Sequence, residues 1–220
     1  MRNVKLRRLG LTGSMLAAGL LIGSVPAQAA TPAGVAGLGS AKFTSNGQTI
    51  EIPAQGFCNV DGTPNASSGV VSQPGVSFGG GTSTCTRTVV NPANHVTTTK
   101  SAALGRNFQL SALMSVGGPR IRINSYRATC VGRRAGTIAN WGVSGVTGLA
   151  GLPQPIPTGF VYQVKKADGT LLATFIFGER FLPNPPDGGI AVNSVHIVFE
   201  KGSGISGEVM VGAAACAKAP

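Results

Sequence analysis

The sequence predicts an all-β protein, an antiparallel β-sandwich of about nine to eleven strands. Short runs of alternating or β-branched residues are separated by glycine- and proline-rich turns, in the spacing typical of a sandwich. No segment keeps a helical hydrophobic period between helix caps. The chain also has four cysteines, and an even number in an exported chain favours two disulfides.

Residues 1–29 are predicted to be an export signal. Four of the first eight residues are basic, Leu11–Val25 is an apolar run of 15 residues, and Ala27-Gln28-Ala29 offers the small residues that a signal peptidase reads. A membrane anchor is the weaker interpretation, since a span needs about 20 apolar residues. The adjacent Arg7 and Arg8 leave a twin-arginine route open beside the general one. We expect a secreted chain with no membrane span in its mature part.

Two-residue turn signals place the clearest strands. Asn46-Gly47 predicts a hairpin between 42–45 and 48–52, and Asp168-Gly169 predicts one between 160–166 and 170–177. Further strands are expected at 86–90, 95–103, 108–116, 120–131, 190–199 and 209–212.

A long polar segment interrupts these strands. Residues 59–84 are dense in Gly, Ser, Thr and Pro and are predicted to form a flexible loop. We expect residues 30–99, which hold the N-terminal strands and this loop, to form one domain with residues 100–220, the core region of the sandwich.

The cysteines are predicted to form two disulfides. Four cysteines allow three pairings, of which we favour Cys58–Cys85, closing the Gly/Ser-rich loop, and Cys130–Cys216, joining a central strand to the last one. No two cysteines are close enough in sequence for zinc-ligand spacing.

Positive charge is concentrated in the middle of the chain. The whole sequence has 18 basic and seven acidic residues; removing the four bases of the leader leaves 14 against seven, a net charge of +7. No acid occurs from residue 62 to residue 167. The 120–131 strand alternates, with Ile121 and Ile123 on one face and Arg120, Arg122 and Asn124 on the other. This pattern predicts a basic face that attracts polyanions, although a basic surface can also serve solubility alone. Its members are Arg120, Arg122, Arg127, Arg133 and Arg134.

Catalytic signatures are weak. His95 and His196 are the only histidines, and we expect His196 to be structural, bonded to backbone or to Asn193. The segment 142–146 (GVSGV) misses the serine-nucleophile elbow at its last position. A glycosidase pair is indicated by residue type only, the candidates being Glu179, Asp187, Glu200 and Glu208. A metal site could use His196, Asp187 and Glu200, but their spacing matches no ligand signature. We expect no metal, and no cofactor, since no phosphate-binding loop is present.

Four segments resemble the choice-of-anchor P family of exported actinobacterial proteins. They are 125–130 (SYRATC), 145–149 (GVTGL), 187–197 (DGGIAVNSVHI) and 207–213 (GEVMVGA). The resemblance implies a surface location and β-structure. It brings no activity and no catalytic residues. The family is joined to C-terminal anchors, and because this chain shows none that we can identify, we expect a released protein.

These observations predict a secreted, non-enzymatic structural or binding protein of the cell surface or medium. The alternative is a basic module that binds an anionic cell-wall polymer or glycan through the 120–134 arginines. A third possibility is a weak extracellular hydrolase with its site in the 153–189 loops. A nucleic-acid partner is not expected, since single-strand binding needs exposed stacking aromatics and Tyr126 alone lies near the arginines.

Overall fold

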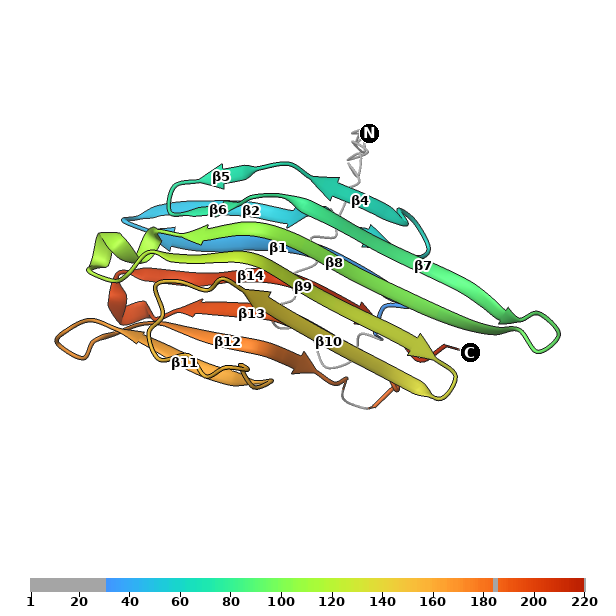
Figure 1. Cartoon of the computed structure of the whole chain (residues 1–220). Coiled ribbons are helices and arrows are strands. Elements are labelled where there is room, and N and C mark those ends of the chain that lie inside the picture. The colour runs from blue at the N-terminus through green and yellow to red at the C-terminus, as the bar shows by residue number, and fades with distance from the viewer. Residues whose placement is uncertain (1–30, 184–185, 220) are drawn as a thin grey trace, which may run out of the picture.

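The computed structural model describes residues 31–183 and 186–219, in which antiparallel strands form two sheets packed face to face (Figure 1). The predicted all-β sandwich is confirmed. The described residues form 14 strands, more than the nine to eleven expected. The predicted export signal lies outside the described residues.

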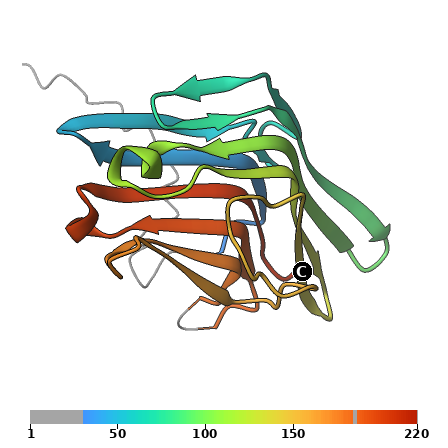
Figure 2. The same cartoon turned by 60° about the vertical axis from the view of Figure 1, so that its left-hand side comes forward.

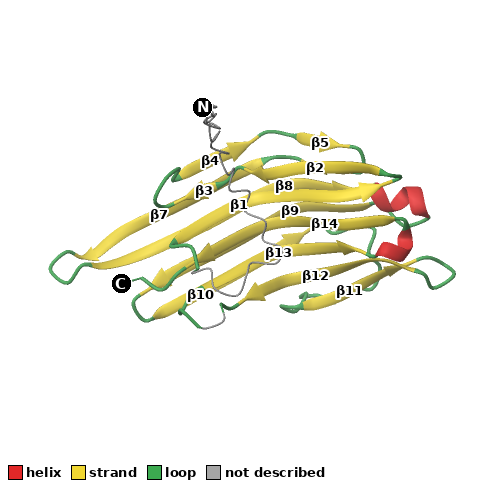
Figure 3. Ribbon diagram, turned by 180° about the vertical axis from the view of Figure 1, so that it is seen from behind, coloured by secondary structure: helices red, strands yellow, loops and turns green. Residues whose placement is uncertain are grey.

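Sheet A holds both ends of the described chain. Its strand order is β11-β12-β13-β14-β1-β2, and the short β3 pairs with β1 beyond β2. Seen from behind, these strands form the near layer (Figure 3). The strands of sheet A are β1 (Gly34–Ser45), β2 (Gln48–Gln55), β3 (Cys58–Asn59), β11 (Phe160–Lys165), β12 (Leu171–Phe181), β13 (Ile190–Phe199) and β14 (Ile205–Cys216).

Sheet B is built on the long strand β8. Its order is β10-β9-β8-β6-β5; β7 pairs with β8 beside β6, and β4 pairs with β7. The strands of sheet B are β4 (Asn65–Ser68), β5 (Val71–Gln73), β6 (Val76–Phe78), β7 (Gly81–Asn91), β8 (Val96–Leu110), β9 (Ile121–Arg133) and β10 (Gly136–Ser144).

Both predicted hairpins form. Asn46 and Gly47 have φ values of 52° and 75°, the left-handed pair that a type I′ turn requires, and they join β1 to β2. Asp168-Gly169 joins β11 to β12, where Asp168 accepts a hydrogen bond from the amide of Thr170. The predicted strand 190–199 coincides with β13.

The prediction of a flexible loop at 59–84 is wrong. Four strand segments, β4, β5, β6 and the start of β7, occupy this region. Two apolar side chains, Val76 and Phe78, are 2% and 1% exposed, and the Phe78 ring lies 5.2 Å from that of Phe108. The strands are hard to predict from the sequence because their many threonines and serines are polar, as loop residues are. Both residue types nevertheless fit a pleated sheet.

The prediction of a strand at 108–116 is wrong beyond its first residues. β8 runs without a break from Val96 to Leu110, and the 3₁₀ helix η1 follows at Ala112–Val116. Gly117 ends this helix with φ of 82°, a left-handed conformation that glycine adopts without strain.

Both predicted disulfides are present, and each crosses the sandwich. Cys58–Cys85 joins β3 to β7 and Cys130–Cys216 joins β9 to β14, with Cα–Cα distances of 5.7 Å and 5.6 Å. The chain-entropy model gives them about 3.5 and about 4.6 kcal/mol of stabilisation for their loop lengths.

The interior has two unlike halves. One half is large and aromatic, with Phe43, Phe175 and Phe177 among its fully buried side chains. The other half consists mainly of alanines and the four cysteines. Small side chains let the two backbones approach closely there, which is the geometry that inter-sheet disulfides need.

A line across sheet A separates these halves, and we call it the kink line. Pairing is interrupted at Gly178, Ser194 and Gly212 in adjacent strands, and it resumes beyond them without a change of register. Val195 lies in the core, yet Ser194 also points inward, since its hydroxyl donates to the Arg127 carbonyl of sheet B at 2.6 Å. Two consecutive residues therefore face the interior, and the side-chain alternation reverses at the line.

Packing from sheet B explains the glycines of the kink line. A Cβ on Gly178 would lie 2.1 Å from the indole of Trp141, and a Cβ on Gly212 would lie 2.9 Å from the ring of Tyr126. Both glycines have φ near +60°, which bulkier residues rarely adopt. The bend of the strands can be followed in Figure 2.

Within residues 31–183 and 186–219, no helix has the length and apolar character that crossing a bilayer requires.

Candidate functional site

The strand register gathers five basic side chains on the outer surface of sheet B, and we call this surface the cationic face. Its strands lie toward the viewer in Figure 1. All five side chains are exposed, and they come from only two neighbouring strands, β8 and β9. The members are Lys100, Arg106, Arg122, Arg127 and Arg133.

Three of the five predicted arginines belong to this face. Arg122, Arg127 and Arg133 point outward from β9. Arg120 precedes the strand, and its Nε lies 3.3 Å from the sulfur of Met114. Arg134 lies in the turn between β9 and β10. Sequence reasoning missed Lys100 and Arg106, which only the pairing of β8 with β9 brings beside these arginines.

The predicted alternation of the 120–131 strand holds only at its start. Ile121 and Ile123 are buried, but Asn124 and Ser125 both face outward, and Tyr126 is then buried. The side-chain alternation of β8 reverses at the same place, opposite Asn124 and Ser125, where Asn107 has φ of 52°. This second reversal is what brings Arg127 and Arg133 to the same face as Arg122.

Acidic residues are absent from β4 to β10. The seven acids of the sequence occupy sheet A, its turns, and the β3–β4 connection. The acid nearest to sheet B in sequence, Asp61, is bonded to Arg87 at 2.8 Å. The four salt bridges found among the described residues include no member of the cationic face. The positive potential of this face is therefore not neutralised by the protein itself.

The side chains between the cations are uncharged, and many are polar, although the apolar Leu104 and Val131 lie among them. Arg122 donates from Nε to the amide oxygen of Gln109 at 3.1 Å, and Ser125 shares a 2.6 Å hydrogen bond with Ser144. Thr129 and Asn140 lie opposite each other further along the strands. Tyr126 faces the core and is 2% exposed, so it offers no stacking surface beside the arginines.

A second cluster, on the outer face of sheet A, was not predicted as a unit. His196 of β13 lies between two carboxylates, with its Nδ1 2.8 Å from Glu179 Oε2 and its Nε2 3.1 Å from Glu208 Oε2. Asn193 donates from Nδ2 to the same Glu179 oxygen at 3.2 Å and also contacts the sulfur of Met210. The predicted structural role of His196 is consistent with this bonding, but the expected partners, neighbouring backbone or Asn193, are wrong: the ring is bonded to Glu179 and Glu208.

The kink line assembles this cluster. Asn193 and His196 are three residues apart, and in a regular strand they would point to opposite faces. The reversal at Ser194 turns both outward. Glu179 lies opposite Asn193 on β12, and Met210 lies opposite His196 on β14.

Both ring nitrogens of His196 face carboxylate oxygens, and only the doubly protonated imidazolium can donate to both. Burial alone lowers the pKa of His196, but the hydrogen bonds and negative charges of Glu179 and Glu208 together outweigh it and raise the pKa above its ordinary value. The two carboxylates therefore favour the protonated form of the ring.

The other acids proposed for chemistry lie apart from His196. Asp187 accepts hydrogen bonds from the amide and hydroxyl of Thr31 and from the amide of Gly189, and the Thr31 bonds lower the pKa of its carboxyl. Glu200 accepts from the Thr174 hydroxyl at 3.1 Å. No group of three metal-capable side chains in suitable geometry occurs among the described residues.

Ser194 is the serine nearest to His196 in sequence, and it points to the other face of its strand, toward Arg127. Ser144 of the imperfect elbow is a β10 residue bonded to Ser125. Neither serine is bonded to the histidine.

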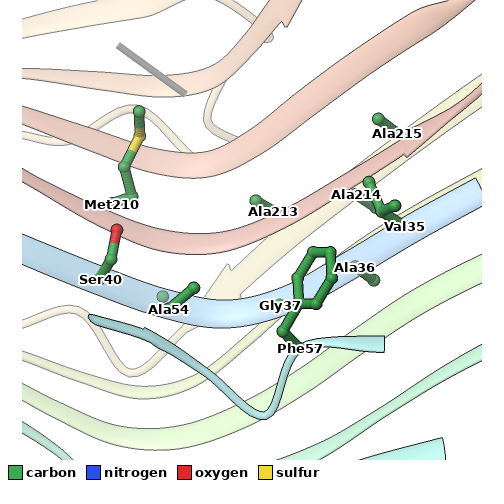
Figure 4. Close-up of a pocket in the computed structure, with 11 residues that line it drawn as sticks. Val35, Ala36, Gly37, Ser40, Ala54, Phe57, Met210, Ala213, Ala214 and Ala215 are labelled. Atoms are coloured by element: carbon green, nitrogen blue, oxygen red, sulfur yellow. The ribbon is translucent and has the colours of Figure 1, made fainter. Parts of the chain in front are cut away.

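A shallow pocket lies on the outer face of β1 and β14 (Figure 4). Small residues line most of it, with Phe57 and Met210 at its sides, and its volume is about 40 Å³. That volume holds one or two waters and no sugar ring or nucleotide.

Fold and surface together define a β-sandwich protein with two disulfides between its sheets and a cationic face on β8 and β9. Comparison with protein-family models, curated proteins and solved structures finds no match to this chain.

Proposed function

We propose that this chain is a secreted binding protein that holds an anionic polymer of the cell surface, a wall polymer or an acidic glycan, on the cationic face. The observation that carries the proposal is the placement of five exposed cations on one acid-free sheet surface. Long-range attraction to a polyanion follows from such a field. The proposal assigns no catalytic step.

Two further features support an extracellular setting. The chain has two disulfides and no free cysteine among its described residues, and disulfides persist in oxidising compartments. The predicted leader agrees with export. The resemblance to the choice-of-anchor P family remains a prediction, and it agrees with a surface location.

Retention on immobilised heparin and on isolated cell wall tests the proposal. We expect elution to require high salt, since screening weakens interactions between exposed charges. The variant Arg122→Ser with Arg127→Ser should elute at clearly lower salt. The matched control Lys165→Ser with Lys166→Ser removes the same charge from the β11–β12 hairpin and should elute near the wild type. Retention that is insensitive to salt, or equal losses in both variants, would contradict the proposal.

A further inference from the structure

The five cations alternate between β9 and β8 along the length of the two strands. Counted along β9, Arg122 comes first, Arg106 lies opposite Ser125, Arg127 follows, Lys100 lies opposite Val131, and Arg133 comes last. From Arg122 to Arg133 there are eleven residue steps, or about 36 Å at about 3.3 Å per residue. The two strands are only about 5 Å apart. The charged strip is therefore long and narrow.

No two cations face each other across this strip. The β8–β9 partner of each of these three cations is uncharged: Gln109 for Arg122, Leu104 for Arg127, and Val131 for Lys100. Spacing of this kind avoids like-charge repulsion. It also offers charges one after another along a line, which suits a chain of repeated anionic groups better than one compact anion.

Neutral hydrogen-bonding side chains occupy part of the intervals between the cations, next to the apolar Leu104 and Val131. Gln109, Asn124, Ser125 and Thr129 lie on the same outward surface of β8 and β9. Their amide and hydroxyl groups can both donate and accept, as sugar hydroxyls do. Four of the five cations are arginines, whose planar guanidinium matches a carboxylate or sulfate with two parallel hydrogen bonds.

From this arrangement we infer that the ligand is an unbranched acidic glycan lying parallel to β8 and β9, and that full binding needs an extended length of about 36 Å. The inference rests on the proposed function and specifies its ligand. Neighbouring hydroxyl and amide groups orient the sugar hydroxyls while the cations hold the acidic groups.

Size-fractionated heparin oligosaccharides, some about half as long as the strip and some longer than it, test the inference by fluorescence anisotropy. Affinity should rise with length up to about 36 Å and then level off. The end variant, Arg122→Ser with Arg133→Ser, should weaken binding of long oligosaccharides about tenfold and leave short ones unchanged. The centre variant, Arg106→Ser with Arg127→Ser, should weaken binding of both. Lys165→Ser with Lys166→Ser is the matched control.

The outcomes separate the inference from the function on which it rests. Absence of binding by long oligosaccharides and by an anionic wall polymer at low salt would contradict the proposed function. Binding that is independent of length, or an end variant that weakens short and long ligands equally, would overturn only the alignment along the strands. Tighter binding of poly(glycerol phosphate) than of an equally long heparin fraction would contradict the assignment of a glycan as the ligand, while the proposal of polyanion binding would stand.

Discussion

The Nδ1 atom of His196 lies 2.8 Å from Oε2 of Glu179, on the adjacent strand of sheet A. The other ring nitrogen is bonded to Glu208 at 3.1 Å, so the imidazolium links β12, β13 and β14 on the outer face. These three strands are central to sheet A, and the charge state of one ring therefore affects how firmly they are joined.

We expect the free energy of unfolding to fall as the pH rises through the pKa of His196. The folded-state pKa is raised, so the stabilising contribution is fully present below the unfolded value of about 6.5 and is lost as the pH rises through the folded value. Urea unfolding followed by the fluorescence of Trp141, the single tryptophan, measures this between about pH 6 and pH 9.

Two histidine variants isolate the source of this pH dependence. His196→Gln should remove it, whereas His95→Gln should retain it, since His95 lies exposed in the β7–β8 turn. An unchanged pH profile in His196→Gln would show that the link to the two glutamates contributes no stability.

Gly105→Ala should destabilise the protein by about 1–3 kcal/mol through overpacking. A Cβ at Gly105 would lie 2.1–2.3 Å from ring atoms of Tyr126, which fills the space between the sheets. Thermal or urea unfolding measures the loss. Gly62→Ala is the matched control because nothing lies within 4 Å of its Cβ position, and similar losses in the two variants would contradict this packing.

Removal of the two disulfides should have unequal effects. Replacing Cys130 and Cys216 by alanine should cost about 1 kcal/mol more than replacing Cys58 and Cys85, because the first bridge closes a loop of 86 residues and the second a loop of 27. The midpoints of urea unfolding provide the comparison. A larger loss for the Cys58–Cys85 pair would mean that local packing outweighs chain entropy.

Amide hydrogen exchange should show protection within residues 59–84. The amide of Gly79 donates to the Arg106 carbonyl at 3.0 Å, next to the buried Phe78. We expect this amide to exchange slowly, and the amide of Asn94 at the exposed tip of the β7–β8 hairpin to exchange quickly. Equal fast exchange at both sites would restore the interpretation of 59–84 as a loop.

Local signals predicted what depends on short stretches of chain. The turns at Asn46-Gly47 and Asp168-Gly169 are set by left-handed turn geometry, which adjacent residues decide. The β-branched run of β13 specifies its own bounds. The favoured one of the three possible disulfide pairings is also confirmed, because it joins cysteines on either side of the Gly/Ser-rich segment and on a central and the last strand.

The candidate sites depend on register, which the sequence did not reveal. Glu179 and Glu208 are 17 and 12 residues from His196, and only strand pairing brings them to its ring. The reversal at Ser194 depends on Tyr126 and Trp141 of the facing sheet, which occupy the space at Gly212 and Gly178. The pattern of residues along one strand carries no information about the side chains of the other sheet that pack against that strand.

The kink line also separates the part of the interior that contains the cysteines from the part that does not. Both cystines lie in the alanine-rich half, whereas the aromatic half contains no cysteine. The aromatic half can therefore collapse without an oxidant, and its pairing strands carry Cys130 toward Cys216 as they continue across the line. We therefore expect folding of the aromatic half to depend on apolar burial alone, and completion of the alanine-rich half to depend also on the redox state of the compartment.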